Sequence, residues 1–239
     1  MDTVHPVACD VEVSFNRHNK FVGPADLTET LFIIGVGATG SHLALTAARM
    51  GFTKFVIYDH DEVEAHNLPN QVYDWKHVGM KKVDALEDVL MRFNHRIEVQ
   101  KHAKYFTSEE HGHEVEGILV IAVDSMKARK DITEVFDGNP LISLVIESRL
   151  GFEFGEVNII DPMSDTDVEN WRSTLLDDNA VPEGPCGLRI CVTTVGIIAS
   201  YMVQQICMQK SQEKSGEEWT PHKKMVMQYD TAGMTVFNI

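Results

Sequence analysis

Short apolar runs alternate with longer amphipathic segments along the first half of the chain. The first apolar run, at 31–34, leads directly into a glycine-rich stretch at 35–40. The pattern then predicts a helix at 41–50 and a second strand at 54–58. Such alternation is typical of βαβ units, whose strands lie parallel in one sheet with helices on its faces. We therefore expect an α/β fold with a Rossmann-like, mainly parallel twisted sheet flanked by helices.

The same alternation continues through the middle of the chain. Apolar positions at helical spacing predict a helix at 79–93, and an unbroken apolar run at 117–122 predicts a strand that is buried on both faces. A short strand at 97–99, a helix at 125–136 and a strand at 141–146 complete the alternating part of the chain.

The pattern changes in the C-terminal part of the chain. Alternation around two glycines predicts a hairpin at 147–160, so antiparallel strands are expected to join the sheet. The polar stretch at 161–185 is predicted to be a long crossover loop on the surface. We predict an uncharged helix at 190–209 and a charged linker at 210–218. Two terminal strands are predicted at 225–229 and 235–237. We expect one domain over 1–239, with an N-terminal arm at 1–30, the core at 31–146 and a C-terminal part at 147–239.

Composition restricts the class of function. The formal net charge is −15 and no long basic stripe is present, which argues against nucleic-acid binding because phosphate contacts need clustered Lys and Arg. Amide side chains in 190–209 are costly in lipid, so this stretch is predicted to be a core or interface helix. No signal peptide is recognised, so a cytoplasmic protein is expected. The four cysteines form no C-x-x-C pair, so no structural zinc is expected.

The glycine-rich stretch is the first candidate site. Gly35, Gly37 and Gly40 form a G-x-G-x-x-G motif between a predicted strand and a predicted helix, where backbone amides and the helix dipole can meet phosphate oxygens. Asp59 ends the second predicted strand, where a carboxylate can accept hydrogen bonds from ribose hydroxyls. A nicotinamide-dependent oxidoreductase explains these features as well as an ATP-binding protein does.

A polar connector after the second strand separates these two classes. It has the pattern D-x-D-x-V-x-x-x-N-L-x-x-Q, formed by Asp59, Asp61, Val63, Asn67, Leu68 and Gln71. The stretch Val78-Gly79-Met80-Lys81-Lys82 follows, and Asp124 precedes Arg129 by five residues after a later strand. This order of motifs resembles the ThiF/MoeB/HesA family, the adenylyltransferases related to ubiquitin-activating enzymes, and is closest to small phage- and plasmid-type members.

The resemblance implies ATP-dependent activation of a carboxylate. In this family the C-terminal carboxylate of a ubiquitin-like protein or peptide attacks the α-phosphate of ATP, and cations with Mg²⁺ neutralise the phosphates. The implied nucleotide-binding residues are Gly35, Gly37, Ala38, Thr39, Gly40, Asp59, Asp61, Asn67, Gln71 and Lys82. Lys82 is expected at the phosphates, Asp59 on the ribose and Asp124 on Mg²⁺. The simpler alternatives are a solvated Lys82 and an Asp124 that caps the next helix.

An arginine and a cysteine are further candidates for catalysis. Many relatives use an arginine from the N-terminal segment, often donated across a homodimer, and Arg17 is the candidate here, with Arg149 and Arg189 as competitors. Many relatives also transfer the acyl group to a cysteine thiol. Cys186, in a Pro-Cys segment ahead of the uncharged helix, is either this nucleophile or a structural cysteine, and Cys191 is the next candidate.

Asn70 departs from the family pattern, which has an arginine before the glutamine, so a cation expected at the phosphates is missing. This departure keeps open a non-catalytic nucleotide-binding scaffold or partner subunit. A nicotinamide-dependent oxidoreductase leaves the acidic connector without a role. The expected partners are ATP, Mg²⁺, a ubiquitin-like protein or peptide and a second copy in a homodimer, and no nucleic acid or membrane is expected. His102, His111 and His113 are interpreted as surface residues.

Overall fold

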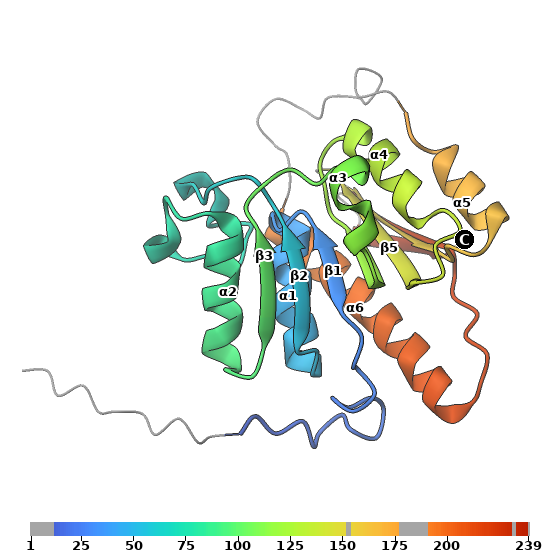
Figure 1. Cartoon of the computed structure of the whole chain (residues 1–239), viewed down its shortest axis with the longest axis horizontal. Helices are drawn as coiled ribbons and strands as arrows, with labels where there is room; N and C mark the ends of the chain where they lie inside the picture. Colours follow the sequence, from blue (N-terminus) through green and yellow to red (C-terminus); the bar gives the residue numbers. More distant parts are fainter. Residues whose placement is uncertain (1–11, 152–153, 177–190, 231–232, 239) are drawn as a thin grey trace, which may run out of the picture.

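The computed structural model describes residues 12–151, 154–176, 191–230 and 233–238. Within these residues, one eight-stranded sheet has the order β3-β2-β1-β4-β5-β6-β7-β8 (Figure 1). Its strands are β1 (Leu31–Ile34), β2 (Lys54–Tyr58), β3 (Glu98–His102), β4 (Gly117–Ile121), β5 (Ile142–Leu150), β6 (Phe154–Ile160), β7 (Lys224–Asp230) and β8 (Gly233–Asn238). The helices are α1 (Ala38–Met50), α2 (Lys82–Phe93), α3 (Ser108–His111), α4 (Met126–Phe136), α5 (Asp165–Arg172) and α6 (Val192–Ser215). Short 3₁₀ turns are η1 (Ala65–Asn67), η2 (Trp75–His77) and η3 (Gly112–Glu114).

The connections between strands determine their directions. The first five strands in the sheet order, from β3 to β5, pair in parallel. Each connection between them returns the chain to the same end of the sheet, so every strand runs in the same direction. Only three residues separate β5 from β6, and β5 to β8 pair antiparallel. This confirms the predicted α/β fold, a mainly parallel sheet that gains antiparallel strands in its C-terminal half.

Both faces of the sheet are covered. Leu31 and Ile33 of β1 belong to an apolar core shared with α1, α2 and α6, whereas Phe32 and Ile34 belong to a second core shared with α4 and α5. This division follows from the two-residue period of a strand, which directs successive side chains to opposite faces. Burial on both faces explains the unbroken apolar runs of β1 and β4, whereas the edge strand β3 is polar and largely exposed.

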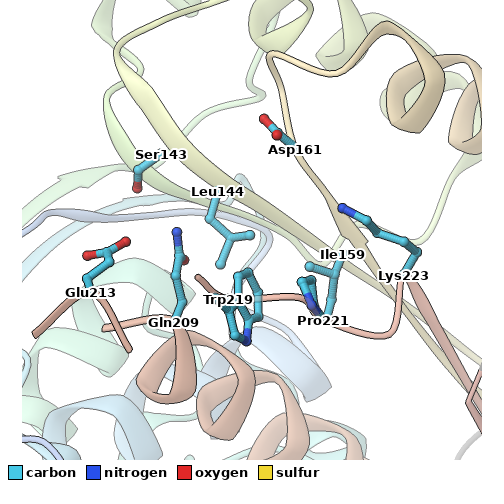
Figure 2. Close-up of a pocket in the computed structure, with 9 residues that line it drawn as sticks. All are labelled: Ser143, Leu144, Ile159, Asp161, Gln209, Glu213, Trp219, Pro221 and Lys223. Carbon is cyan, nitrogen blue, oxygen red and sulfur yellow. The ribbon is translucent and has the colours of Figure 1, made fainter. Parts of the chain in front are cut away.

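The helix α6 runs six residues into the predicted linker at 210–218, so that prediction is wrong over these residues. Lys210 is buried there, and its ammonium lies 2.8 Å from a carboxylate oxygen of Glu29 and 2.9 Å from one of Glu213. Because the two carboxylates neutralise the charge of Lys210, this lysine is buried inside the helix and α6 continues past it. The last turns of α6 line a cavity with β5 and β6 (Figure 2). Among the described helices, α6 included, none is long and apolar enough to cross a membrane.

Two other predicted boundaries shift for physical reasons. The helix predicted at 79–93 begins only at Lys82, because Gly79 has a φ of +88°, which lies outside the helical region. The strand predicted at 141–146 continues to the end of β5. Glu147 and Arg149, which follow the apolar run, pair with each other in the protein interior instead of facing water.

Two polar segments differ from their predicted surface roles. The predicted crossover loop at 161–185 contains α5, whose N-cap Ser164 accepts a hydrogen bond from the Asp167 backbone N–H. His111 is only 2% exposed, and its ring centroid lies 5.2 Å from that of Tyr58. The interpretation of His111 as a surface residue is therefore wrong, while His113 is exposed as expected.

Two glycine substitutions test the packing between β1 and α1. A Cβ atom on Gly40 would lie 1.9 Å from the carbonyl oxygen of Gly35, whereas one on Gly196, inside α6, would meet nothing within 4 Å. We expect Gly40→Ala to lower the free energy of unfolding by about 3 kcal/mol. Gly196→Ala should raise it by about 0.5–1 kcal/mol, because alanine favours the helix. Urea unfolding followed by circular dichroism measures both, and a Gly40→Ala protein as stable as the parent would contradict the packing.

Candidate functional site

The glycine-rich loop lies at a topological switch point of the sheet. The connection from β1 leads to β2 on one side, whereas β4 pairs with β1 on the other side, and open α/β sheets bind ligands in the crevice at the carboxyl end of the strands at such a switch point. Gly35 has a φ of +91°, and a Cβ atom there would lie 2.6 Å from the carbonyl oxygen of Ala122. Only glycine fits this turn, which follows β1 and packs against the backbone at the end of β4.

The N-terminus of α1 faces the crevice without a side-chain cap. Gly37 is the N-cap residue, and no side chain of the described part of the chain accepts a hydrogen bond from the first turn. A Cβ atom on Gly37 would meet only Gln71 Nε2, at 4.0 Å. The backbone N–H groups of Ala38, Thr39 and Gly40 are therefore placed as anion donors at the positive end of the helix dipole.

Asp59 and Tyr73 hold the glycine-rich loop from two directions. The backbone N–H of Val36 donates to Asp59 Oδ2 at 2.9 Å, and the Tyr73 hydroxyl donates to the Val36 carbonyl at 2.6 Å. Burial, with a smaller effect of the Asp59 charge, raises the pKa of Tyr73, so its hydroxyl remains a donor. Asp59 Oδ1 accepts the Asp61 N–H, and each carboxylate oxygen retains a lone pair for a ribose hydroxyl. The sequence analysis missed Tyr73, although it follows the connector by two residues.

Lys82 opens α2 and points back to the acidic connector. Its ammonium lies 2.6 Å from Asp61 Oδ2, and its side chain is 8% exposed. Burial raises the pKa of Asp61, but the hydrogen bond and charge of Lys82, together with His60 and Lys81, lower it further, so the net shift is downward. Lys82 is thus a buried cation anchored beside Asp59 and not the solvated lysine of the simpler alternative. An ammonium has three N–H donors, so one bond to Asp61 leaves donors for a phosphate.

Asp124 follows β4 and has an exposed side chain. The N-cap of α4 is Ser125, whose hydroxyl accepts a hydrogen bond from the Ala128 N–H at 3.1 Å. Asp124 is therefore not the helix cap of the simpler alternative. None of the described hydrogen bonds or ion pairs engages its carboxylate, which leaves both oxygens available to a ligand.

The remaining connector residues pack on the first turns of α1. Asn67 uses its Oδ1 to accept the Glu64 N–H within η1, so its side chain serves the local turn. Gln71 Oε1 and His42 Nε2 are buried and have no hydrogen-bond partner among the described residues. Burial lowers the pKa of His42, partly offset by a hydrogen bond with the Asn70 backbone. Buried polar atoms without partners are costly, and their presence beside an uncapped helix end fits a polar ligand.

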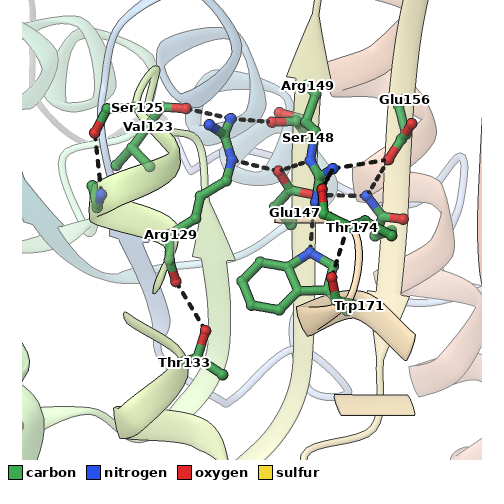
Figure 3. Close-up of polar contacts among 12 residues, drawn as sticks. Val123, Ser125, Arg129, Thr133, Glu147, Ser148, Arg149, Glu156, Trp171 and Thr174 are labelled. Atoms are coloured by element: carbon green, nitrogen blue, oxygen red, sulfur yellow. Dashed lines mark hydrogen bonds and ion pairs between the residues drawn. The ribbon is translucent and has the colours of Figure 1, made fainter. Parts of the chain in front are cut away.

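Arg129 belongs to a buried network centred on Glu147 (Figure 3). Glu147 is fully buried, and its Oε1 accepts hydrogen bonds from Arg129 Nε at 2.6 Å and from Arg149 Nε at 3.0 Å. Its Oε2 accepts from Asn158 Nδ2 at 2.6 Å and from Trp171 Nε1 at 3.2 Å. Two cations and two neutral donors thus compensate one buried carboxylate.

This network connects the Asp124 loop to the C-terminal strands. Arg129 also donates to the carbonyl of Val123, the residue before Asp124. Arg149 donates to the Thr174 hydroxyl at 2.8 Å, near the end of α5. The network therefore positions the end of β4 relative to β5 and α5, and it occupies Arg149, which was a competing candidate for the phosphates.

The other candidate residues lie away from the crevice or outside the described residues. Arg17 is exposed, and the adjacent His18 donates to the Met50 carbonyl at the C-terminal end of α1. With a rise of about 1.5 Å per residue, that end lies about 18 Å from the glycine-rich loop. Cys186 and Arg189 lie outside the described residues.

Cys191 is the N-cap residue of α6. Hydrogen bonds from the Thr193 hydroxyl and backbone and from the Thr194 backbone lower the pKa of its thiol. Cys207 lies in the middle of α6, and burial raises the pKa of its thiol to about 12. The two thiols of the same helix therefore differ in their tendency to form a thiolate.

Comparison with known proteins shows similarity over most of the chain. A model described as the ThiF family matches residues 26–239. Ubiquitin-like modifier-activating enzyme 5 is 26% identical over 196 residues in Branchiostoma floridae, covering 73% of this chain and 48% of that protein. In Xenopus laevis it is 26% identical over 201 residues, covering 75% and 50%. The chain thus spans about half the length of these relatives.

Solved structures share the fold. E. coli MccB with ATP superposes with a TM-score of 0.66 and 16% identity, covering 90% of this chain and 64% of that one. PaaA superposes with a TM-score of 0.66 and 18% identity, covering 90% of this chain and 75% of that one. At this identity the superpositions establish the architecture alone.

Glu147→Gln tests the buried network. The substitution keeps the shape of the side chain but leaves the buried Arg129 without its carboxylate partner and Arg149 with Glu156, at 3.6 Å, so we expect the free energy of unfolding to fall by about 3–5 kcal/mol. Glu169→Gln is the matched control, because Glu169 is exposed and, among the described ion pairs, contacts Arg172 alone at the surface. Its effect should stay within about 0.5 kcal/mol. Equal urea midpoints for the two variants would contradict the role of Glu147.

Alkylation rates test the difference between the two thiols of α6. At pH 8, iodoacetamide should modify Cys191 about tenfold or more faster than Cys207, measured by mass spectrometry of the separate peptides. Thr193→Val removes one donor to the thiol, so the pKa of Cys191 should rise and its rate at pH 7 should fall. In guanidinium chloride the two rates should converge. Equal rates in the folded protein would show that the helix end does not activate Cys191.

Proposed function

The chain belongs to the ThiF family, and from this membership we propose that it is an ATP-dependent adenylyltransferase. Its substrate is the C-terminal carboxylate of a ubiquitin-like protein or a peptide. The observation that carries the proposal is the convergence of the uncapped α1 N-terminus, Asp59, the Lys82–Asp61 pair and Asp124 at the carboxyl ends of β1, β2 and β4. The relatives named as ubiquitin-like modifier-activating enzymes and the MccB structures with ATP and with its peptide MccA support it.

The proposed reaction forms one bond and breaks one. A carboxylate oxygen attacks the α-phosphorus of ATP, and the bond from that phosphorus to the bridging oxygen breaks, which gives an acyl-adenylate and pyrophosphate. A carboxylate is already ionised near neutral pH, so no general base is needed. The barrier is electrostatic, because an anion approaches a polyanion, and catalysis therefore consists of positioning and charge compensation.

The residues of the crevice divide these tasks. The N–H groups of Ala38, Thr39 and Gly40 donate to phosphate oxygens, and Asp59 accepts from the ribose hydroxyls. Lys82 compensates phosphate charge while Asp61 keeps its ammonium in place. Gln71 has its Nε2 beside Gly37, from which it donates to a phosphate oxygen, and its unpaired Oε1 accepts from a bound water.

Asp124 is the proposed ligand for Mg²⁺. Carboxylate oxygen is the donor type that Mg²⁺ prefers, and both oxygens of this exposed side chain are free of the described contacts. When bound, the ion supplies charge neutralisation at the phosphates. Asp124 itself is placed by the β4 end, which Arg129 ties to the Glu147 network.

Arg17 and Cys186 complete the proposal. Because Arg17 lies at the far end of α1, it reaches a phosphate only in the crevice of a second copy, which is consistent with a homodimer.

In a second step, the Cys186 thiolate attacks the acyl carbon of the adenylate, AMP leaves and a thioester forms. Non-reducing gels should then show an adduct that thiols release and that Cys186→Ala abolishes.

A nucleotide-binding partner subunit without catalysis is the second candidate. Asn70 stands where the family pattern has an arginine, and the one buried lysine of the crevice already pairs with Asp61 within the described residues. This candidate predicts that Mg-ATP binds but that no exchange between ATP and pyrophosphate occurs with any carboxylate partner.

Exchange of labelled pyrophosphate into ATP separates the two candidates. With Mg-ATP and ubiquitin-like proteins that carry a free C-terminal glycine, the parent protein should catalyse exchange. Asp124→Ala and Lys82→Ala should each lower the rate about 100-fold or more, because each removes charge compensation from the transition state. Lys54→Ala is the control, since this exposed lysine begins β2, at the end of the strand opposite to Asp59. Exchange that survives both site substitutions would exclude the assigned residues.

A further inference from the structure

A cavity of about 260 Å³ lies far from the crevice, between the last turns of α6, the beginning of β5 and the end of β6 (Figure 2). Ser143, the second residue of β5, lies on its wall, whereas the glycine-rich loop follows the opposite, carboxyl end of the parallel strands. Leu144 and Ile159 supply apolar wall, and Trp219 and Pro221 cover it from the segment before β7. Nothing in the proposed adenylation uses this cavity.

The charges around the cavity favour a cation. Among the residues that the structure describes, the ionisable groups in its wall and in direct contact with the wall are Glu29, Asp161, Asp167, Lys210, Glu213 and Lys223. Both lysines are already paired, since Lys223 lies 2.6 Å from Asp167 and Lys210 bridges two glutamates. The four carboxylates exceed the two ammonium groups, so the site retains two negative charges. An anionic ligand is disfavoured there.

Two further features specify the kind of cation. Figure 2 shows the Trp219 side chain beside Leu144 and Pro221 in the lining of the cavity, and Trp is the best partner for a cation–π contact. Gln209 lines the cavity as well, and its Oε1 is buried without a hydrogen-bond partner among the described residues. A small turn of the amide presents this acceptor to a donor in the cavity, which removes the cost of an unpaired polar atom.

We propose that this cavity receives an arginine side chain of a partner protein. Its volume is below the roughly 300–1,000 Å³ of sites for drug-sized ligands, so it suits one side chain. A planar guanidinium stacks on an aromatic face and donates several hydrogen bonds in one plane, whereas a lysine ammonium is a strongly hydrated point charge. The guanidinium lies against Trp219 and donates to Gln209 and Glu213. The net charge of −15 also favours a partner with a basic surface.

Tryptophan fluorescence of the whole chain tests this proposal. Trp75→Phe removes the exposed tryptophan, and Trp171 is buried in the other core, so the change in emission reports Trp219. The probe is acetyl-Gly-Arg-Gly-amide, and the control is the same peptide with citrulline, which has a neutral urea group of similar shape. The arginine peptide should give a saturable change in tryptophan emission. The citrulline peptide should need an about tenfold higher concentration for the same change.

Matched variants give effects of opposite sign. Gln209→Glu adds a carboxylate and should tighten binding of the arginine peptide about three- to fivefold, and Glu213→Gln should weaken it by a similar factor. Glu217→Gln, beyond the end of α6 and outside the cavity wall, should leave binding unchanged. Because Gln209→Glu is expected to tighten binding of the peptide, a variant that merely unfolds cannot produce the same result. Binding of Mg-ATP by all variants serves as an independent measure of folding and of the crevice.

Three results would overturn the proposal. The first is equal binding of the arginine and citrulline peptides, and the second is an affinity that neither Gln209→Glu nor Glu213→Gln changes. The third is agmatine, the free guanidinium amine, binding more tightly than the peptide, which would assign the cavity to a small cation. Each result leaves the adenylation proposal untouched, because that proposal depends on the crevice alone.

Discussion

At the end of β1 the backbone packs so closely against the end of β4 and the first turn of α1 that no side chain fits between them. The candidate site depends on this constraint. Cβ atoms on Gly35 and Gly40 would overlap backbone carbonyl groups of Ala122 and Gly35. The close approach brings the α1 N-terminus and the end of β4 to one point at the switch in strand order. Asp59 and Tyr73 then hold Val36 at its N–H and carbonyl, so the amide donors are oriented before a nucleotide binds.

Charge compensation is the second organising principle of this acidic protein. Glu147 joins two arginines, an asparagine and a tryptophan from four different elements, and it fixes the end of β4 relative to the C-terminal strands. Lys210 and Lys82 are likewise buried against carboxylates. These cations stabilise the fold or anchor the site. In the proposed reaction, much of the phosphate charge is therefore left to Mg²⁺ and to an arginine of a second copy.

The fold was predictable where apolar periodicity carries the information. Alternation along 31–122 predicted parallel strands with covered faces, and residues 31 to 34 divide between the two apolar cores as a strand must. Prediction failed where an ion pair, as for Lys210, or packing against aromatic rings, as for His111, keeps a polar side chain out of water. Lys210 was assigned to a linker and His111 to the surface, because a polar side chain in sequence does not reveal the partner that allows its burial.

The sequence by itself determined the class of fold, the position of the glycine-rich loop and the acidic connector, because these depend on local residue type and spacing. Only the tertiary structure decided which polar groups meet: Asp61 with Lys82, Tyr73 with Val36, and Glu147 with Arg129. It also separated Arg17 from the crevice by the length of α1. Spacing along a chain sets the identity of a helix or strand, whereas contacts between distant residues exist only after the sheet has brought them together.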